Sequence, residues 1–184
     1  MEHIVPHVEP PWRTLELNIP DLIQIFTPPM IHRKSFKDDW RDDHNNFVAE
    51  NKENPKFLFT YSDRSLTEQR GRRTGYSIIA YNKGQKVFKR SGALGEHTEV
   101  YDAEMMGLCM AADATRDYLL AEHPHPKPSN IIFYSDNVGS ITRIFDGALG
   151  KAQAHLRAFV TNCTGLCHMS HPSRFCDTFS AHIG

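Results

Sequence analysis

Two short apolar runs of similar make-up stand out in the pattern of hydrophobic and polar positions. Residues 57–61 and 131–134 are uncharged, and each run is followed by Ser-Asp, at Asp63 and Asp136. Runs of this length, bounded by polar sequence, are typical of strands buried on both faces of a sheet. If the two strands lie side by side and parallel, both aspartates emerge at the carboxyl edge of the sheet, where α/β proteins bind ligands.

Between these runs, the pattern changes from strand-like alternation to a helical period. Residues 75–81 and 86–94 alternate on either side of a short turn, which predicts an antiparallel hairpin with one wet face. Residues 98–121 then place apolar side chains at helical spacing, which predicts a long helix. Glu104 lies beside the apolar stripe of this helix, whereas Asp102 lies on the opposite side.

The residues before the first run are predicted to be a connector. Residues 1–34 hold six of the eleven prolines, which break helices and cannot donate to a sheet ladder. Alternation over residues 15–19 allows one short edge strand. From Ser35, apolar side chains up to Val48 share one face, which predicts an accessory helix resting on the main domain.

After Asp136, the helical signal is weaker and then stops. Residues 138–149 and 151–160 predict two shorter helices. Residues 161–184, called the tail below, hold three cysteines and three histidines with no sustained period. A zinc site is an open alternative for the tail, but the spacing matches no common zinc motif. Its four candidate ligands would be Cys163, Cys167, His171 and Cys176. Cys109, in the long helix, is most simply a core residue.

Composition and charge indicate which partners and which location the protein can have. The chain has 184 residues, 40% of them hydrophobic, with a formal net charge of −1 and a pI near 6.8. No global field therefore draws it to nucleic acid or to a membrane. Residues 64–95 are locally basic, with eight basic residues against one acidic residue. Their first part, residues 64–74, is predicted to be a polar loop. Four irregularly spaced cysteines, and the absence of a signal sequence or long apolar run, indicate an intracellular protein without a membrane span. Nucleus and cytoplasm are not distinguished.

The acids at the sheet edge call for a cation. Asp63 and Asp136, joined by Glu104 from the helix, would repel one another without a cationic partner. A divalent cation among them removes that repulsion, and carboxylate oxygens are the ligands that magnesium prefers. Each acid alone is more simply a cap, a turn residue or a surface residue. Their joint occurrence favours a metal site.

The order strand, hairpin, long helix, strand, helix resembles the type 1 ribonuclease H domain, and more narrowly the domain of retroelement reverse transcriptases. The resemblance covers about residues 56–160. It is carried by Tyr-Ser-Asp-Arg-Ser at 61–65, Val-Tyr-Asp-Ala-Glu at 100–104 and Phe-Tyr-Ser-Asp-Asn at 133–137. It implies a three-layer α/β fold whose mixed sheet has an antiparallel hairpin of strands one to three and a parallel strand four. The domains would be a connector at 1–55, the incomplete ribonuclease H-like domain at 56–160 and the atypical tail.

The resemblance also implies an activity. The family hydrolyses the RNA strand of RNA–DNA hybrids with two magnesium ions, manganese being the alternative, and here Asp63, Glu104 and Asp136 would be both catalytic and metal-binding. A reverse transcriptase of a parent element would be a partner, besides the hybrid. The competing hypothesis is an inactive remnant that at most binds nucleic acid. The residues expected to contact nucleic acid are Arg64, Ser65, Arg70, Arg72, Arg73 and Asn137.

Two departures from the family limit this expectation. Arg64 stands where the family has glycine, and its side chain would either contact phosphate or obstruct the substrate. The family also continues into a fifth strand, a Gly-His loop and a helix that opens with a fourth aspartate. The tail matches none of these, which suggests a truncated or frame-shifted end with Asp177 as its sole aspartate. We therefore expect residues after Val160 to pack poorly, an open sheet edge beside residues 131–134, and slow cleavage.

Overall fold

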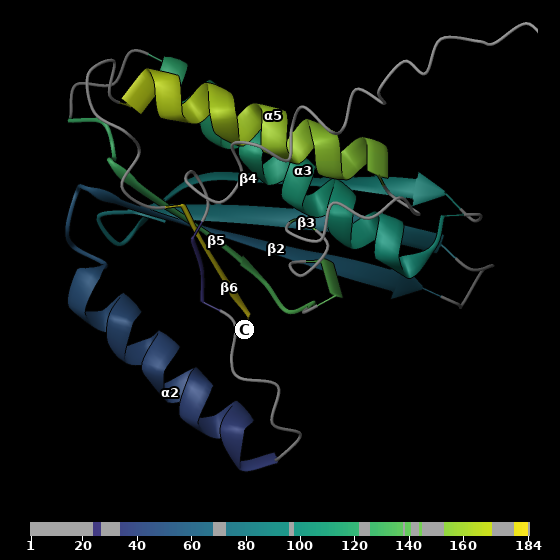
Figure 1. The fold of residues 1–184 in the computed structure, drawn as a ribbon, viewed down its shortest axis with the longest axis horizontal. Helices are drawn as coiled ribbons and strands as arrows, with labels where there is room; N and C mark the ends of the chain where they lie inside the picture. Colours follow the sequence, from purple (N-terminus) through teal and green to yellow (C-terminus); the bar gives the residue numbers. More distant parts are fainter. Residues whose placement is uncertain are drawn as a thin grey trace, which may run out of the picture.

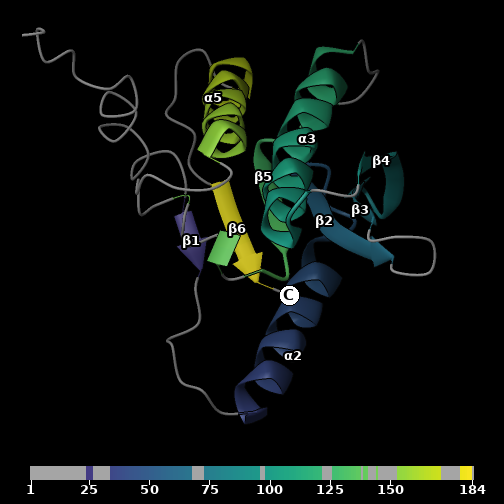
Figure 2. The ribbon, with the colours of Figure 1, turned by 90° about the vertical axis from the view of Figure 1, so that its right-hand side faces the viewer.

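The computed structural model describes residues 24–26, 34–67, 73–95, 98–121, 126–137, 139–140, 144, 153–170 and 179–183. They form a mixed sheet between two helical layers (Figures 1 and 2). Helices α3 (Val100–Leu120) and α5 (Gln153–Ser170) cover one face, and α2 (Lys34–Asn51) lies against the other. This is the three-layer α/β architecture that the sequence predicts.

The first three long strands form an antiparallel meander. These are β2 (Phe57–Thr67), β3 (Arg73–Asn82) and β4 (Gln85–Gly95). Lys83 and Gly84 connect β3 to β4 with positive φ angles of 51° and 67°. Two successive left-handed residues match the twist of a two-residue hairpin, and glycine adopts that conformation without steric cost. The predicted hairpin is therefore confirmed.

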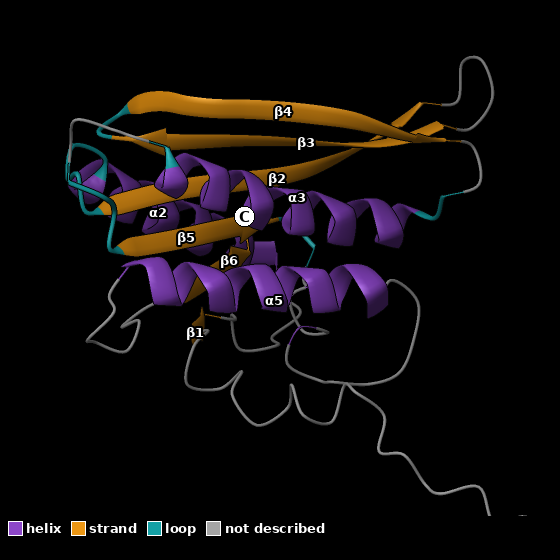
Figure 3. Ribbon diagram, turned by 90° about the horizontal axis from the view of Figure 1, so that it is seen from above, coloured by secondary structure: helices purple, strands orange, loops and turns teal. Residues whose placement is uncertain are grey.

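Strand β5 (Asn130–Ser135) joins the meander from the other side, parallel to β2. The sheet order is β1-β6-β5-β2-β3-β4, as Figure 3 shows from above. The order β4-β3-β2-β5, antiparallel except for the last pair, is that of a ribonuclease H-like fold, and it confirms the predicted fold class.

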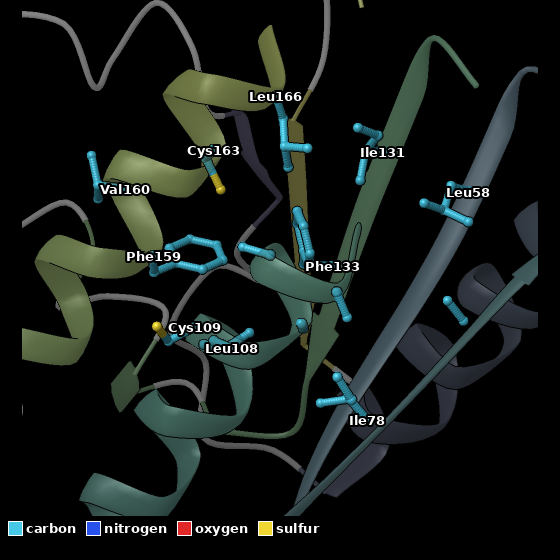
Figure 4. Close-up of a cluster of buried hydrophobic side chains, with 14 of the residues drawn as sticks. Leu58, Ile78, Leu108, Cys109, Ile131, Phe133, Phe159, Val160, Cys163 and Leu166 are labelled. Atoms are coloured by element: carbon cyan, nitrogen blue, oxygen red, sulfur yellow. The ribbon is translucent and has the colours of Figure 1, made fainter. Parts of the chain in front are cut away.

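The main core fills the space between the sheet and the helices α3 and α5 (Figure 4). Phe133 of β5 and Phe159 of α5 meet edge to face, with ring centroids 5.5 Å apart. Burial of such aromatic and aliphatic side chains is the main stabilising contribution to a domain of this size. Cys109 lies in this core as expected. Other buried members are Leu58, Ile78, Leu108, Ile131, Cys163 and Leu166.

The second face of the sheet carries a smaller, aromatic cluster. Phe59, Ile132 and Tyr134 are buried there, and Phe47 and Val48 of α2 pack against them. Since neighbouring residues of a strand point to opposite faces, Phe59 and Leu58 reach different layers. The accessory helix predicted from Ser35 is confirmed as α2, which rests on this cluster.

The expectation that the residues after Val160 pack poorly is wrong for the first of them. Helix α5 continues to Ser170, and both Cys163 and Leu166 are fully buried against the core. Arg116 of α3 also donates a hydrogen bond of 3.0 Å to Asn162 of α5. The physical reason is that the apolar stripe of α5 runs on through the position where the family resemblance ends.

The expected open edge beside β5 is also wrong. Strand β6 (Phe179–Ile183), from the tail, pairs parallel with β5, and β1 (Gln24–Phe26) pairs parallel with β6. Of the two expectations for the final strand, missing or replaced, the described residues therefore show a replacement. The edge strand expected over residues 15–19 and most of the helix expected over residues 138–149 lie outside the described residues.

Candidate active site

Asp63 and Asp136 lie at the edge of the sheet where the parallel pairing ends. The last paired residues of β2 and β5 are Ser62 and Ser135, so the two aspartates follow on neighbouring strands. Both side chains are exposed. The prediction that the two apolar runs are adjacent and parallel is thus confirmed, and the aspartates emerge at the carboxyl end of both strands.

Glu104 is held on the sheet-facing side of α3 with no exposed surface. Helix α3 lies very close to β2 here, because a Cβ atom at Gly107 would collide with Ser62 Oγ. The start of the helix is fixed as well, since Thr98 Oγ1 donates to the carbonyl of Leu94 at 2.7 Å. Close approach of a helix to the sheet buries the residue one turn away, which here is an acid.

Arg64 forms an ion pair with Glu104. Its Nε atom lies 2.6 Å from Glu104 Oε1, and its side chain is 38% exposed. The polar loop predicted over residues 64–74 is wrong at its start, because β2 continues to Thr67 and pairs with β3, Arg64 lying opposite Tyr76. As a strand residue two positions after Ser62, Arg64 points to the same face, towards α3.

The electrostatics of Glu104 link all three acids. Its pKa is raised from 4.5 to about 7, first by burial and next by the negative charge of Asp136. The positive charge of Arg64 lowers the pKa, and Asp63 raises it by a smaller effect. By strand alternation Asp63 falls on the α2 face, which accounts for its weaker influence.

The residues present have donor chemistry that suits a divalent cation. Neither oxygen of the buried Glu104 carboxylate has a hydrogen-bond partner of good geometry, so the contact with Arg64 is primarily an ion pair. Ser62 Oγ, on the same face of β2, is likewise buried without such a partner. Buried polar atoms of this kind are costly unless a ligand satisfies them.

The described side chains are nevertheless not arranged as a ready metal site. Among the described residues, no group of three or more histidine, cysteine, aspartate or glutamate side chains is placed to hold a metal ion. Arg64 occupies one oxygen of Glu104, and alternation directs Asp63 away from that face. The three acids therefore share one edge and one electrostatic field without forming a shared coordination shell.

The residues expected to contact nucleic acid fall into different settings. Arg64 and Ser65 lie on β2, and Arg73 opens β3 with an exposed side chain. Arg70 and Arg72 lie outside the described residues. Asn137 has a structural task, because its Oδ1 accepts the backbone N–H of Ser140 at 3.1 Å, as the first residue before a helical turn does.

The basic hairpin is partly neutralised by α3, which sequence reasoning missed. Arg90 of β4 donates to Asp117 at 2.9 Å and lies 3.9 Å from Asp113. Asp113 also pairs with Arg116. A spacing of four residues between two aspartates on the hairpin-facing side of the predicted helix is the signal that could have indicated this pairing. The remaining surface charge of β4 comes from Lys86 and Lys89.

Several of the tail residues predicted as ligands lie outside the described part of the chain. Cys163 faces the core. Asp177, the expected substitute for the fourth acid, lies outside the described residues, as do His171 and Cys176 of the alternative zinc set. Among the described helices, none combines the length and apolar character needed to cross a membrane.

Comparison with known proteins returns structural neighbours but no sequence relatives. No family model and no curated protein matches the chain. Solved structures similar to it include ribonuclease H domains. RNase H1 of Halobacterium salinarum NRC-1 is 17% identical, with a TM-score of 0.46 over 70% of this chain and 85% of that chain. The RNase H domain from Mycobacterium tuberculosis is 14% identical, with a TM-score of 0.48 over 70% and 86%. The PFV RNase H domain is 14% identical, with a TM-score of 0.43 over 70% and 78%. The fold assignment rests on the strand order, because similarities at this level do not establish one.

Proposed function

We propose that this chain is a ribonuclease H-like domain of the retroelement kind that hydrolyses the RNA strand of RNA–DNA hybrids, slowly. One observation carries the proposal. A buried glutamate on the long helix, Glu104, shares an electrostatic field with Asp63 and Asp136, which end two adjacent parallel strands. A buried acid whose pKa is raised by neighbouring acids at the carboxyl edge of a sheet is a strong indication of a functional site.

Each acid has a role in this proposal. Asp63, Glu104 and Asp136 would hold two magnesium ions, or manganese in their place, once Arg64 has left Glu104 and the exposed Asp63 side chain has turned towards it. When bound, such ions supply an activated water and stabilise the leaving 3′ oxygen of the cleaved RNA strand. The chain's own contribution is positional: α3 fixes Glu104 at the sheet, and the pairing of β2 with β5 fixes both aspartates on adjacent strands.

Recognition of the hybrid would rest on its shape and charge. Arg73 and the lysines of β4 lie on exposed strand positions. Contacts with phosphates and 2′-hydroxyls carry no base specificity, so affinity should be modest and should fall with salt. A reverse transcriptase from the same element remains the partner we propose.

A catalytically inactive remnant that only binds nucleic acid is the second candidate function. The observation that favours it is the ion pair between Arg64 and Glu104, which occupies an acid that catalysis would need. The tail sequence does not match the family segment that opens with the fourth aspartate, and this favours it too. Both features point to weak metal binding, which is why the proposed cleavage is slow.

Cleavage of a labelled RNA–DNA hybrid by the purified chain in magnesium tests the proposal. We expect slow cleavage of the RNA strand, and none of the DNA strand, that Asp136→Asn abolishes. Asp102→Asn is the matched control. Asp102 is half-buried on the same helix as Glu104, and the spacing of two residues puts it on the opposite side of that helix. Cleavage that persists in Asp136→Asn would show that the activity arises elsewhere. Salt-dependent binding without any cleavage would establish the second candidate.

A further inference from the structure

Strand alternation makes residue 64 the position on β2 from which a side chain reaches Glu104. Leu58 packs in the core beneath α3, and Ser62 meets Gly107 of that helix. Position 64 is the next on the same face as these two residues. The resemblance to ribonuclease H leads one to expect glycine there, which would place no side chain between β2 and the glutamate. Arginine fills that space with a fixed positive charge.

The contact has the features of an internal counter-ion. Arg64 Nε lies 2.6 Å from Glu104 Oε1, and the carboxylate has no exposed surface. A guanidinium stays protonated at any pH at which the protein is folded, so this charge cannot be removed by titration. The arginine side chain is 38% exposed, so it can move to solvent without breaking the core.

We infer that Arg64 competes with a divalent cation for Glu104, so that metal binds only as the guanidinium leaves. The inference rests on the proposed function, because it takes Glu104 to be a metal ligand. A guanidinium in contact with Oε1 and a divalent cation on the same carboxylate would repel each other, and the burial of the Glu104 side chain weakens screening of that repulsion by water. Arg64 therefore sets the metal affinity of the site. In the metal-free protein it stabilises this edge of the sheet by neutralising Glu104.

Metal titration at pH 8 of the wild type and Arg64→Met tests this directly. Methionine retains an unbranched apolar stem and removes the charge. We expect Arg64→Met to bind manganese about 10-fold more tightly, the usual size of a coupling between two ligands of one protein. The control is Arg90→Met, which removes the same charge on β4. Its partner Asp113 lies nine residues from Glu104 along α3, or about 14 Å.

Thermal unfolding gives a second readout, and its manganese-dependent part is one that a purely structural arginine would not move. In chelator, Arg64→Met should melt below the wild type, because the buried carboxylate loses its cation. Saturating manganese should raise the melting temperature of Arg64→Met by more than that of the wild type. Equal manganese affinity and equal stabilisation in the two proteins would overturn the inference while leaving the metal site intact.

The remaining outcomes separate this inference from the proposed function. If Arg64→Met gains affinity but Asp63→Asn and Asp136→Asn do not weaken it, Glu104 binds metal outside the proposed three-acid site and only the proposed function fails. If neither protein binds manganese or magnesium at millimolar concentration, both proposals fail. If Arg64→Met does not fold, the inference is tested in the wild type by the NMR resonance of the Arg64 Nε–H group. This resonance should shift on magnesium saturation while that of Arg90 stays unchanged, and an unmoved Arg64 resonance would overturn the inference.

Discussion

The two faces of the sheet are built from alternate residues of the same strands, yet they differ in kind. The face under α3 and α5 is mainly aliphatic and closely packed, with small helix residues such as Ala111 and Ala112 fully buried. One acid, Glu104, is embedded in it. The face under α2 is aromatic: Tyr61 stacks on Tyr134 with centroids 4.8 Å apart, and His44 meets Tyr134 edge to face at 4.4 Å.

The difference shows that one strand, β2, supplies different residues to the two faces of the sheet. Even-numbered residues of β2 serve the packed face and include Arg64, which touches Glu104. Odd-numbered residues support α2 and include Asp63. Because side-chain direction alternates, a shift of one residue in register would exchange these two charges and leave the buried acid beside another acid. The long pairing of β2 with β3 therefore protects the electrostatics of the site as well as the fold.

The largest effect we predict is a loss of stability on the packed face. Phe133→Ala should cost about 3–5 kcal/mol of unfolding free energy, because Phe133 is fully buried against Phe159. Phe59→Ala, on the other face, should cost less, since α2 can move towards the vacated space. Denaturant unfolding measures both.

Ile131→Val is the control for this comparison. It lies on the same face as Phe133, and removing one methylene should cost about 0.5–1.5 kcal/mol. If Phe59→Ala proves more costly than Phe133→Ala, the aromatic face is the main core and the contrast drawn here is inverted.

The next effect concerns the embedded acid. The pKa of Glu104 is raised to about 7, so its contribution to stability is present below pH 4.5 and is lost as the pH rises through 7. Glu104→Gln carries no charge at any of these pH values. In chelator at pH 8 it should therefore be more stable than the wild type, by at most about 3 kcal/mol.

The comparison is repeated at pH 4.5, where the wild-type carboxyl is protonated and the difference should vanish. Adding manganese at pH 8 should then stabilise the wild type and not Glu104→Gln. A variant that is less stable than the wild type at pH 8 would show that the ion pair with Arg64 outweighs the cost of burying the charge.

Much of this arrangement can be predicted from the sequence, because the hydrophobic periodicity of each element is clear and the elements follow one another in a recognisable order. The runs ending at Asp63 and Asp136, the hairpin and the long helix are each encoded by local pattern. The contact of Arg64 with Glu104 is not, because it depends on β2 continuing beyond Asp63, which its pairing with β3 decides. The pairing of β6 with β5 is equally non-local, since nothing in the composition of the tail selects its partner strand. Burial of Cys163 was missed because the family resemblance, rather than the helical stripe, set the expected boundary.

A smaller effect is expected where α2 meets the aromatic face. Phe47 is half-buried, with its ring 5.9 Å from Phe57 and 6.2 Å from Phe59. Phe47→Ala should cost about 1–2 kcal/mol, below the range for a fully buried phenylalanine. The loss should be local, so amide exchange should quicken in α2 while α3 keeps its protection. Asn46→Ala, at an exposed position of the same helix, is the control. Equal loss of protection in both helices would mean that α2 and the packed face unfold as one unit.

The smallest effect is the pH dependence that His44 gives to the same face. Burial lowers the pKa of His44 below 6.5, and its Nδ1 atom is buried without a hydrogen-bond partner. The neutral ring is therefore favoured in the folded protein, while the unfolded chain takes up a proton near pH 6.5. Stability should fall as the pH drops from 6.5 through the lowered folded pKa, and it should be level above 6.5.

His44→Phe keeps an edge-to-face ring against Tyr134 and should lose this dependence without a loss of stability at pH 8. Unfolding in chelator at pH 5.5 and 8 measures it, and Glu104→Gln serves as the background so that the opposite trend of Glu104 does not mask the result. A stability that still falls below pH 6.5 in the double variant Glu104→Gln/His44→Phe would assign the titration to another group.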